Sequence, residues 1–209
     1  MAELKGQFFR KNYMAKKRLK KEKFLILICG LPSTGKTTLA KKLAGQINQY
    51  ILISQNDIRR KMGIKRMPKT QEKVLRAIDR LIAENLLSGL GVICESVNRC
   101  SFRRQQIYGV ASGCGRRVIT LEIVCSEETA KSRILKRQKG DELISDPTDP
   151  AVYDRLKTLW QNIGVDFQYP GEDHVAYLQF DSEKNKLKRI IPRKGMREIF
   201  NQIEKTLRS

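Results

Sequence analysis

The sequence predicts an α/β fold, a mostly parallel five-stranded sheet with helices on both faces. Short apolar runs rich in β-branched residues alternate with segments whose apolar residues recur at helical spacing. Repeated strand, helix, strand units require right-handed crossovers, which make neighbouring strands parallel and place helices on the two faces of the sheet. A chain of 209 residues with 40% hydrophobic residues is long enough and apolar enough to bury one continuous core.

The expected strands are short apolar runs, and the first, Phe24 to Cys29, is typical of a strand buried on both faces. Four more runs follow, at 50–53, 91–95, 118–125 and 175–180. Helical spacing of apolar residues predicts helices at 36–44, 69–87, 103–111, 127–138, 151–163 and around 199–207. Gly45 is placed to end the first of these helices. Tyr153, Leu156 and Trp160 share one helical face, which favours core packing over base stacking.

The chain is strongly basic, because 42 Lys and Arg residues stand against 22 Asp and Glu residues and leave a net charge of +20. Residues 1–23 hold nine of the basic residues and two acids, which predicts a basic N-terminal arm ahead of a domain that spans 24–209. A second basic stretch, 184–197, contains seven Lys or Arg residues and no acid. Positive charge is therefore expected at both ends of the chain.

Cysteine usage and hydropathy indicate a cytoplasmic protein without a membrane partner. The five cysteines are scattered and form no C-x-x-C pair, which favours reduced thiols over a disulfide framework. The longest apolar run, at 24–29, is far too short to span a bilayer. The basic N-terminal segment also lacks the apolar stretch and cleavage site of a signal peptide.

A phosphate-binding loop is predicted between the first strand and the first helix. The segment GLPSTGKTT at 30–38 matches G-x-x-x-x-G-K-[ST] in the strand-to-helix context that this motif requires. Its backbone N–H groups and the start of the helix are expected to bind the phosphates of ATP. Lys36 is expected to reach the β- and γ-phosphates, and the Thr37 hydroxyl to hold Mg²⁺. The predicted nucleotide-binding residues are Gly30, Leu31, Pro32, Ser33, Thr34, Gly35, Lys36, Thr37 and Thr38.

Other motifs narrow the class of nucleotide-binding protein. A GTPase would need a D-x-x-G switch and an N-K-x-D base-binding motif, and neither string occurs in the sequence. Motors and remodelling ATPases usually carry an Asp-Glu pair at the end of a strand, whereas here the third strand ends Ile93-Cys94-Glu95-Ser96. These patterns favour a kinase.

The sequence resembles the P-loop kinases that include polynucleotide 5′-kinases, zeta-toxin-like kinases and small ATP-binding kinases. The resemblance covers about residues 24–180 and rests mainly on GLPSTGKTTLA at 30–40. ISQNDIRR at 53–60, VICESVN at 92–98, and SRILKR at 132–137 followed by SDPTDPAVY at 145–153 add to it. It implies the P-loop nucleoside triphosphate hydrolase fold, an ATP-dependent phosphotransferase activity, and a lid at about 133–150.

In this family a D-x-x-R unit after the second strand places a carboxylate beside the acceptor hydroxyl and an arginine near its phosphate. Here one register sets Asn56 and Arg59 on those positions, and a register shifted by one residue sets Asp57 and Arg60 there. We take Asp57 as the catalytic carboxylate, with Arg59 and Arg60 binding substrate. Whichever of Asn56 and Asp57 is not catalytic is expected to cap the next helix.

The resemblance also implies roles for residues after the third strand and in the lid. Glu95 stands where the family usually has Asp, and is expected to bind the acceptor or a water on magnesium; the alternative is an ion pair with a neighbouring base. Arg103 resembles a substrate-binding arginine of polynucleotide kinases. Arg133 and Arg137 lie four residues apart, hence on one helical face, and are expected to stabilise the transferring phosphoryl group; the alternative is a solvated basic face.

The charge of the chain bears on the acceptor. Lys and Arg contacts to phosphates release counterions and tighten polyanion binding, which favours a nucleic-acid partner, RNA or DNA, phosphorylated on a terminal 5′-hydroxyl. Two alternatives remain open at this stage. One is a kinase of a nucleotide or other small molecule, and the other is a nucleotide-dependent nucleic-acid-binding protein without transferase activity.

Overall fold

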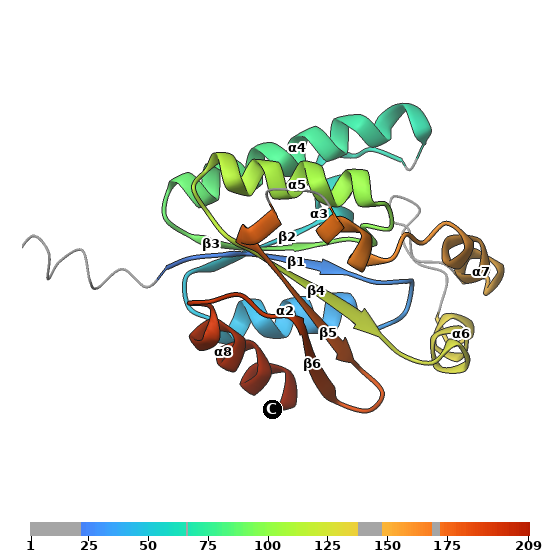
Figure 1. Ribbon diagram of the computed structural model, residues 1–209. Coiled ribbons are helices and arrows are strands. Elements are labelled where there is room, and N and C mark those ends of the chain that lie inside the picture. The colour runs from blue at the N-terminus through green and yellow to red at the C-terminus, as the bar shows by residue number, and fades with distance from the viewer. Residues whose placement is uncertain (1–21, 66, 138–147, 169–171) are drawn as a thin grey trace, which may run out of the picture.

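The computed structural model describes residues 22–65, 67–137, 148–168 and 172–209, which form one six-stranded α/β sheet (Figure 1). The basic arm lies outside these residues except for Glu22 and Lys23, as does 138–147 of the expected lid. The strands are β1 Leu25–Cys29, β2 Tyr50–Ser54, β3 Gly91–Glu95, β4 Val118–Val124, β5 Val175–Asp181 and β6 Lys186–Ile191. The helices are α2 Lys36–Gln46, α3 Gln55–Met62, α4 Pro68–Leu87, α5 Ser101–Gly113, α6 Glu127–Leu135, α7 Ala151–Thr158 and α8 Arg197–Arg208, with 3₁₀ turns at η1 Ile163–Gln168 and η2 Glu172–His174.

The strand order is β2-β3-β1-β4-β5-β6, and every pair is parallel except β5 with β6. The predicted α/β fold with a mostly parallel sheet is therefore confirmed. The chain leaves β1 toward β2 on one side of the sheet, whereas β4 follows on the other side, so the end of β1 lies at a switch point of the strand order. Ligands of open α/β sheets bind at such a point, beyond the carboxyl ends of the strands.

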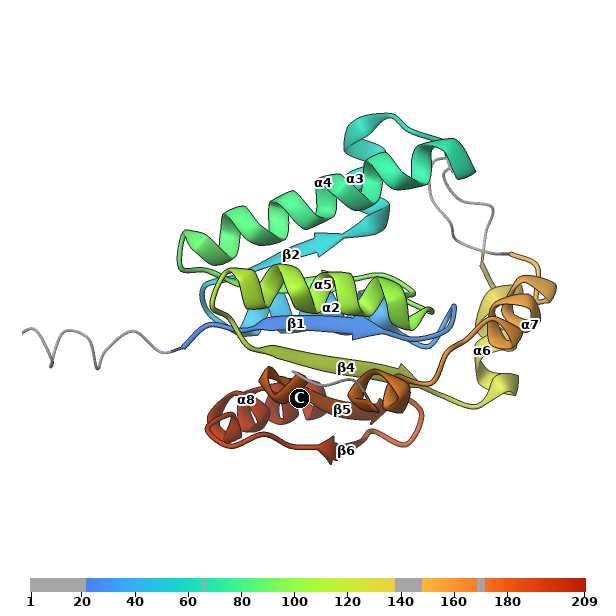
Figure 2. The same cartoon turned by 45° about the horizontal axis from the view of Figure 1, so that its top comes forward.

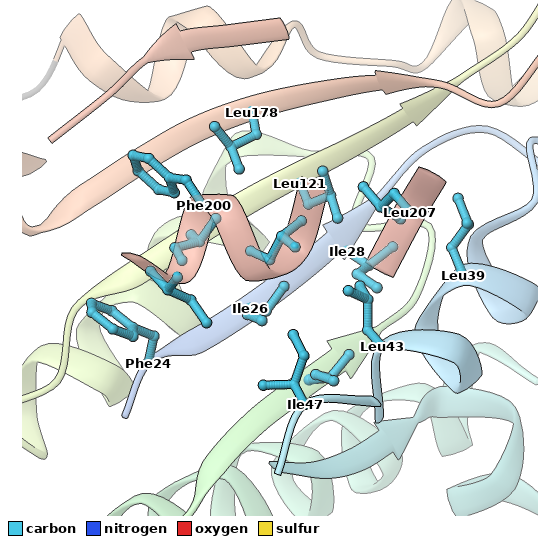
Figure 3. Packing of buried hydrophobic residues seen from close by; sticks show 14 of the residues in the cluster. Phe24, Ile26, Ile28, Leu39, Leu43, Ile47, Leu121, Leu178, Phe200 and Leu207 are labelled. Carbon is cyan, nitrogen blue, oxygen red and sulfur yellow. The ribbon is translucent and has the colours of Figure 1, made fainter. Parts of the chain in front are cut away.

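Helices cover both faces of the sheet, and each face has its own apolar cluster (Figure 2). On one face α2 and α8 pack on β1 and β4, with Leu43 and Phe200 among the buried residues (Figure 3). On the other face the buried residues of α4 and α5 include Ile82 and Ile107. Alternate residues of β1 enter the two clusters, and all five are buried. This burial on both faces agrees with the continuous apolar run of β1 in the sequence.

The sixth strand corrects the predicted count of five. β6 runs antiparallel to β5 at the edge of the sheet and takes up part of the basic stretch 184–197. Lys186, Lys188 and Arg189 are exposed, and only Leu187 and Ile191 are half-buried against the apolar clusters. The charged residues of an edge strand hide its apolar pattern.

Three helix expectations also need correction. Gly45 does not end α2, which continues to Gln46 with Ile47 as its C-cap, because Leu43 and Ile47 both reach the core. The helix expected over 151–163 ends at Thr158, and a 3₁₀ turn begins at Ile163. Residues 55–62 form α3, and its N-cap is Ser54, so Asn56 and Asp57 lie within its first turn instead of capping it.

A buried ion pair fastens α5 to η1. Arg104 and Asp166 are fully buried, and the Arg104 Nε and Nη2 atoms donate to the Asp166 carboxylate at 2.6 and 2.7 Å. Ser101 Oγ and the Tyr108 hydroxyl donate to the same carboxylate at 2.6 and 2.9 Å.

The five cysteines are free thiols. Among the described residues, no helix is long and apolar enough to cross a bilayer.

Candidate active site: the phosphate-binding loop and its neighbours

The segment between β1 and α2 forms a tight loop whose conformation depends on two glycines. Gly30 has a φ of 149°, and a Cβ at this position would lie 2.4 Å from the main-chain oxygen of Ile123 on β4. Gly35 has a φ of 98°, and Ser33 between them also adopts a positive φ, 62°. The Thr34 hydroxyl closes the turn by donating to the Leu31 carbonyl at 3.0 Å. The loop is therefore bent back on itself, and only glycine fits at position 30.

The loop ends at the N-terminus of α2, where the backbone favours an anion. Gly35 is the N-cap, no side chain caps the helix, and no acidic residue lies in its first turn. The first amides of a helix and its dipole are a ready site for phosphate oxygens. Lys36 is buried, and its Nζ donates to the Leu31 carbonyl at 2.7 Å, so the ammonium lies across the loop. Thr37 and Thr38 are exposed at the same helix end.

Glu95 connects the loop to two neighbouring strands. Glu95 lies at the carboxyl end of β3 and is 6% exposed, and its carboxylate accepts a hydrogen bond from the Thr37 hydroxyl at 3.3 Å. Ser54, the last residue of β2, donates to the other carboxylate oxygen at 3.1 Å. These contacts place a carboxylate and two hydroxyls beside the start of α2. An oxygen-only set of this kind fits the ligand preference of Mg²⁺.

Arg133 of α6 contacts the phosphate-binding loop from the β4–β5 side of β1, whereas Glu95 lies on the β3 side. Its Nη1 atom donates to the Ser33 carbonyl at 3.2 Å and to Ser182 Oγ at 3.4 Å. Arg137 lies beyond the end of α6 at Leu135, so the helical spacing that placed it on one face with Arg133 does not apply. Leu31 of the loop packs against a small apolar cluster formed by Ala130, Ile134 and Tyr153 of α6 and α7.

Two of the α3 residues that were expected at the acceptor site line a cavity that is separate from the phosphate-binding loop. The Asp57 carboxylate forms an ion pair with Arg60 at 2.6 Å, and both side chains are about half exposed. These two residues line a cavity of about 340 Å³ with Ser54, Leu81 and Asn85. Ser54 also donates to Glu95, which accepts from Thr37, so two hydrogen bonds link one residue of the cavity lining to the start of α2. Arg59 is fully buried and donates to Gln71 on α4, which indicates a role in holding α3 against α4.

Arg103 lies on α5 and is bound by a carboxylate of α4. Its Nη1 and Nη2 atoms donate to the two carboxylate oxygens of Asp79 at 2.8 and 2.7 Å, and its side chain is 9% exposed. A two-pronged pair of this kind fixes the guanidinium in one orientation. This geometry favours a structural role for Arg103, in joining α4 to α5, over contact with a substrate.

Three residues at this edge of the sheet were not assigned a role from the sequence. Ser54 is the last residue of β2, one residue past the strand expected at 50–53, and Ser182 and Glu183 follow β5. The carboxyl ends of parallel strands meet at one edge of a sheet, so a polar residue directly after a predicted strand was the available signal. Figures 1 and 2 show β1 and β4 pointing toward the end of the molecule where α6 and α7 lie.

Fold and site together define a P-loop kinase: a Gly-Lys-Thr loop at the N-terminus of α2, a carboxylate on the adjoining strand and a parallel sheet that presents both. ATP binding follows from this class. Residues 25–159 match the sequence profile of the AAA domain family AAA_33, and the chain belongs to that family.

Solved structures share the fold. Kti12 of Chaetomium thermophilum, in complex with ADP-AlF3, is 21% identical with a TM-score of 0.57, covering 88% of this chain and 98% of that one. A gluconokinase of Sinorhizobium meliloti 1021 is 17% identical with a TM-score of 0.52, covering 88% and 91%. The Pnkp1/Rnl/Hen1 RNA repair complex contains a chain that is 13% identical with a TM-score of 0.57, covering 72% and 48%. No curated protein matches the sequence.

Proposed function

We propose that the protein transfers the γ-phosphoryl group of ATP to a hydroxyl of a nucleic acid, preferably a terminal 5′-hydroxyl. The observation that carries the transferase part is the chain of contacts from Thr37 through Glu95 to Ser54. These contacts link the start of α2 to a residue that lines a cavity together with Asp57, which supports a donor site beside a candidate acceptor site.

On the donor side, the loop amides and Lys36 bind the triphosphate, and Arg133 approaches from α6. Thr37 and Glu95 are the residues that would hold magnesium, and their oxygen atoms fit that ion. When bound, magnesium neutralises charge on the β- and γ-phosphates. Lys36 and Arg133 add fixed positive charge where the transferring group is most negative, and Arg137 is a further candidate for this role.

On the acceptor side, Asp57 accepts the proton of the attacking hydroxyl. The acceptor oxygen bonds to the γ-phosphorus, the bond to the bridging oxygen breaks, and ADP leaves. Arg60 pairs with the Asp57 carboxylate at 2.6 Å. Its role in the proposal is to bind a phosphate of the acceptor. The transition state is loose, so this step depends more on positioning than on the strength of the base.

Charge supports a nucleic acid as the acceptor. Arg60, Lys61, Lys65 and Arg99 are exposed on α3 and on the segments that follow α3 and β3. On the other side of the loop, Lys184, Lys186 and Lys188 line a second cavity of about 150 Å³ on the β5–β6 hairpin. Basic residues on both sides of the loop suit a ligand with several phosphates, each of which releases counterions when a cationic side chain binds it.

A small-molecule kinase is the second candidate, and the cavity beside Ser54 supports it. Its volume of about 340 Å³ falls in the range of pockets for small ligands. The gluconokinase covers 88% of this chain, so its fold extends well beyond the phosphate-binding half. Under this proposal the hydroxyl belongs to a nucleoside or sugar that fits the cavity.

A transfer assay decides between the two. The protein is incubated with magnesium and ATP labelled at the γ-phosphate, together with 5′-hydroxyl oligonucleotides of RNA and DNA, nucleosides and sugars. Label on the 5′ end of an oligonucleotide supports the first proposal, and label on a small molecule alone supports the second. Absence of label on any acceptor, with ATP still bound, would leave a binding protein without transferase activity. Lys36→Ala should abolish transfer, whereas Lys41→Ala, on the exposed side of the same helix, should not.

A salt titration tests the nucleic-acid part separately. Replacing Lys186 and Lys188 with Gln should weaken binding of a single-stranded oligonucleotide and reduce the slope of log K against log salt by about 0.7 for each phosphate that the variant no longer neutralises. A chain that begins at residue 22 should show a larger reduction, since the basic arm is removed. Binding that is insensitive to both changes would argue against a polyanion acceptor.

A further inference from the structure

The first turn of α6 is held from outside by one carboxylate on the β5–β6 turn. Glu183 accepts a hydrogen bond from the Ser126 amide at 2.9 Å and from the Thr129 hydroxyl at 2.8 Å. Ser126 is the N-cap of α6, and its own hydroxyl accepts from the Thr129 amide at 3.2 Å. Hydrogen bonds to Glu183 lower the pKa of its carboxyl group, the largest effect coming from the Ser126 amide and smaller ones from the Thr129 and Ser126 hydroxyls. The carboxylate is therefore charged at neutral pH.

The same turn contacts the phosphate-binding loop and its arginine. Ser182, next to Glu183, accepts from Arg133 Nη1 at 3.4 Å. A Cβ placed on Gly35 would lie 3.7 Å from the Ser182 side chain, so the turn sits directly against the start of α2. The 182–183 segment therefore adjoins the loop, the first turn of α6 and Arg133 at once.

The turn is itself fixed. The Ser182 amide donates to the Val124 carbonyl at 2.8 Å, which ties the turn to the end of β4. The amides of Glu183 and Lys184 both donate to Asp181 Oδ1 at 3.0 Å. Because the turn is held to the sheet by these bonds, it can hold another element in place.

By contrast, the ion pairs of α6 bind it mainly to α7. Lys131 pairs with Glu127 on its own helix and with Asp154 on α7, at 2.6 and 2.7 Å, and Lys157 of α7 pairs with Glu127 at 2.6 Å. In the described part of the chain, this helix pair contacts the rest of the domain through the apolar cluster at Leu31 and Cys125, through the hydrogen bond from Arg133 to the Ser33 carbonyl, and through the β5–β6 turn. Among the described residues the apolar cluster has only three buried members, so the directional hydrogen bonds to Glu183 add a constraint on the orientation of the first turn of α6.

We propose that Glu183 is a positioning residue, which holds the first turn of α6 so that Arg133 points at the phosphate-binding loop. This inference rests on the role proposed above for Arg133 in stabilising the transferring phosphoryl group. Loss of the Glu183 carboxylate would leave nucleotide binding by the loop amides and Lys36 intact, but would let Arg133 move away from the group in transfer.

The test compares the binding of ADP alone with that of ADP and aluminium fluoride, which together mimic the group in transfer and need no acceptor. We expect Glu183→Ala to weaken the aluminium fluoride complex about tenfold and to change ADP affinity by less than about twofold. Arg133→Ala should have an effect of at least this size. Adding Glu183→Ala to Arg133→Ala should then change the aluminium fluoride complex by less than about twofold, because the two residues act in series.

Two further variants serve as controls. Glu128→Ala removes an exposed carboxylate from the same first turn of α6 and should leave both affinities unchanged. Glu183→Gln keeps the length and one acceptor oxygen, and should recover part of the affinity. The inference is overturned if Glu183→Ala leaves the aluminium fluoride complex unchanged, or weakens it equally in the Arg133→Ala background. It is also overturned if Arg133→Ala itself has no effect on the aluminium fluoride complex. That result would remove the proposed role of Arg133 in binding the phosphoryl group, but it would not bear on which acceptor the protein uses.

Discussion

The Thr37 hydroxyl donates to the Glu95 carboxylate at 3.3 Å, which joins the first turn of α2 to the end of β3. The hydroxyl and the carboxylate that we propose to hold magnesium are thus hydrogen-bonded to each other. Glu95 ends a strand that pairs on both sides, with β1 and β2, and the helix that carries Thr37 packs on the same sheet. The fold therefore brings these two side chains together.

Substitution of the two candidate carboxylates should separate their roles. Glu95→Gln removes the charge beside Thr37, and we expect it to weaken magnesium-dependent ATP binding and to lower the transfer rate by roughly 10²-fold. Asp57→Asn should lower the rate while nucleotide affinity is unchanged, because Asp57 lies in the cavity beyond Ser54. Steady-state kinetics and titration with ATP measure both effects. If Asp57→Asn had full activity, the carboxylate of the acceptor site would have to be sought elsewhere.

Two glycines separated by 15 residues should respond oppositely to alanine. Gly30→Ala places a methyl group 2.4 Å from the Ile123 oxygen at a φ of 149°, and should destabilise the domain by about 1–3 kcal/mol and abolish ATP binding. Gly45 is exposed on α2, and a Cβ added there would have no other atom within 4 Å. Gly45→Ala should therefore raise the free energy of unfolding by about 0.5–1 kcal/mol. Urea denaturation measures both. Equal effects of the two substitutions would contradict the loop geometry.

Breaking the buried ion pair between Arg104 and Asp166 should lower the free energy of unfolding more than breaking an exposed ion pair does. Asp166→Asn leaves a fully buried guanidinium without its counter-charge and should cost about 3–5 kcal/mol. Glu72→Gln breaks a pair with Arg76 whose side chains are 70% and 78% exposed, and should cost less than about 1 kcal/mol. Chemical denaturation of the two variants gives the comparison. A small effect of Asp166→Asn would mean that water reaches this site.

Alkaline pH should destabilise the domain through its buried thiols. Burial raises the pKa of Cys94 from 9.0 to about 12, although nearby Arg103 opposes the shift, and burial raises the pKa of Cys29 as well. A raised pKa means that the folded state retains the proton, so the stabilisation is complete below pH 9 and is lost as the pH rises toward 12. The decrease from one thiol is at most about 1.4 kcal/mol per pH unit.

Urea unfolding at several pH values between about 8 and 11 checks this expectation. Cys94→Ala lacks one of the titrating groups, so its free energy of unfolding should fall less steeply with pH than that of the unmodified protein. The slopes are compared, and not the absolute values, because the substitution also removes packing atoms. Parallel slopes would show that the Cys94 thiolate forms as easily in the folded state as in the unfolded one.

The phosphate-binding loop could be predicted from the sequence because all its determinants are consecutive. Gly30, Gly35 and Lys36 carry the conformation and the charge within one strand-to-helix connection. The buried strands were predictable for a similar reason, since a run such as 24–29 is apolar at every position. Local pattern is enough where one short segment supplies the whole physical cause.

Residues whose partners are distant in the sequence could not be assigned in this way. Arg103 is bound by Asp79, 24 residues earlier, and nothing in the local sequence distinguishes it from a substrate-binding arginine. The partnership of Glu95 with Thr37 spans 58 residues. β6 was missed for another reason: Lys186 and Lys188 face solvent at an edge, so a strand is present without the alternation that marks one.

β6 lies at the edge of the sheet, and its charges affect whether two copies of the protein can associate through this strand. An edge strand exposes unpaired amides and carbonyls to which a strand of another molecule could add. Two copies that joined through β6 would bring Lys186 and Lys188 of each close to the same residues of the other, and this repulsion disfavours continuous sheets of stacked copies. The lysines that we propose to bind a polyanion would thus also disfavour self-association along this edge.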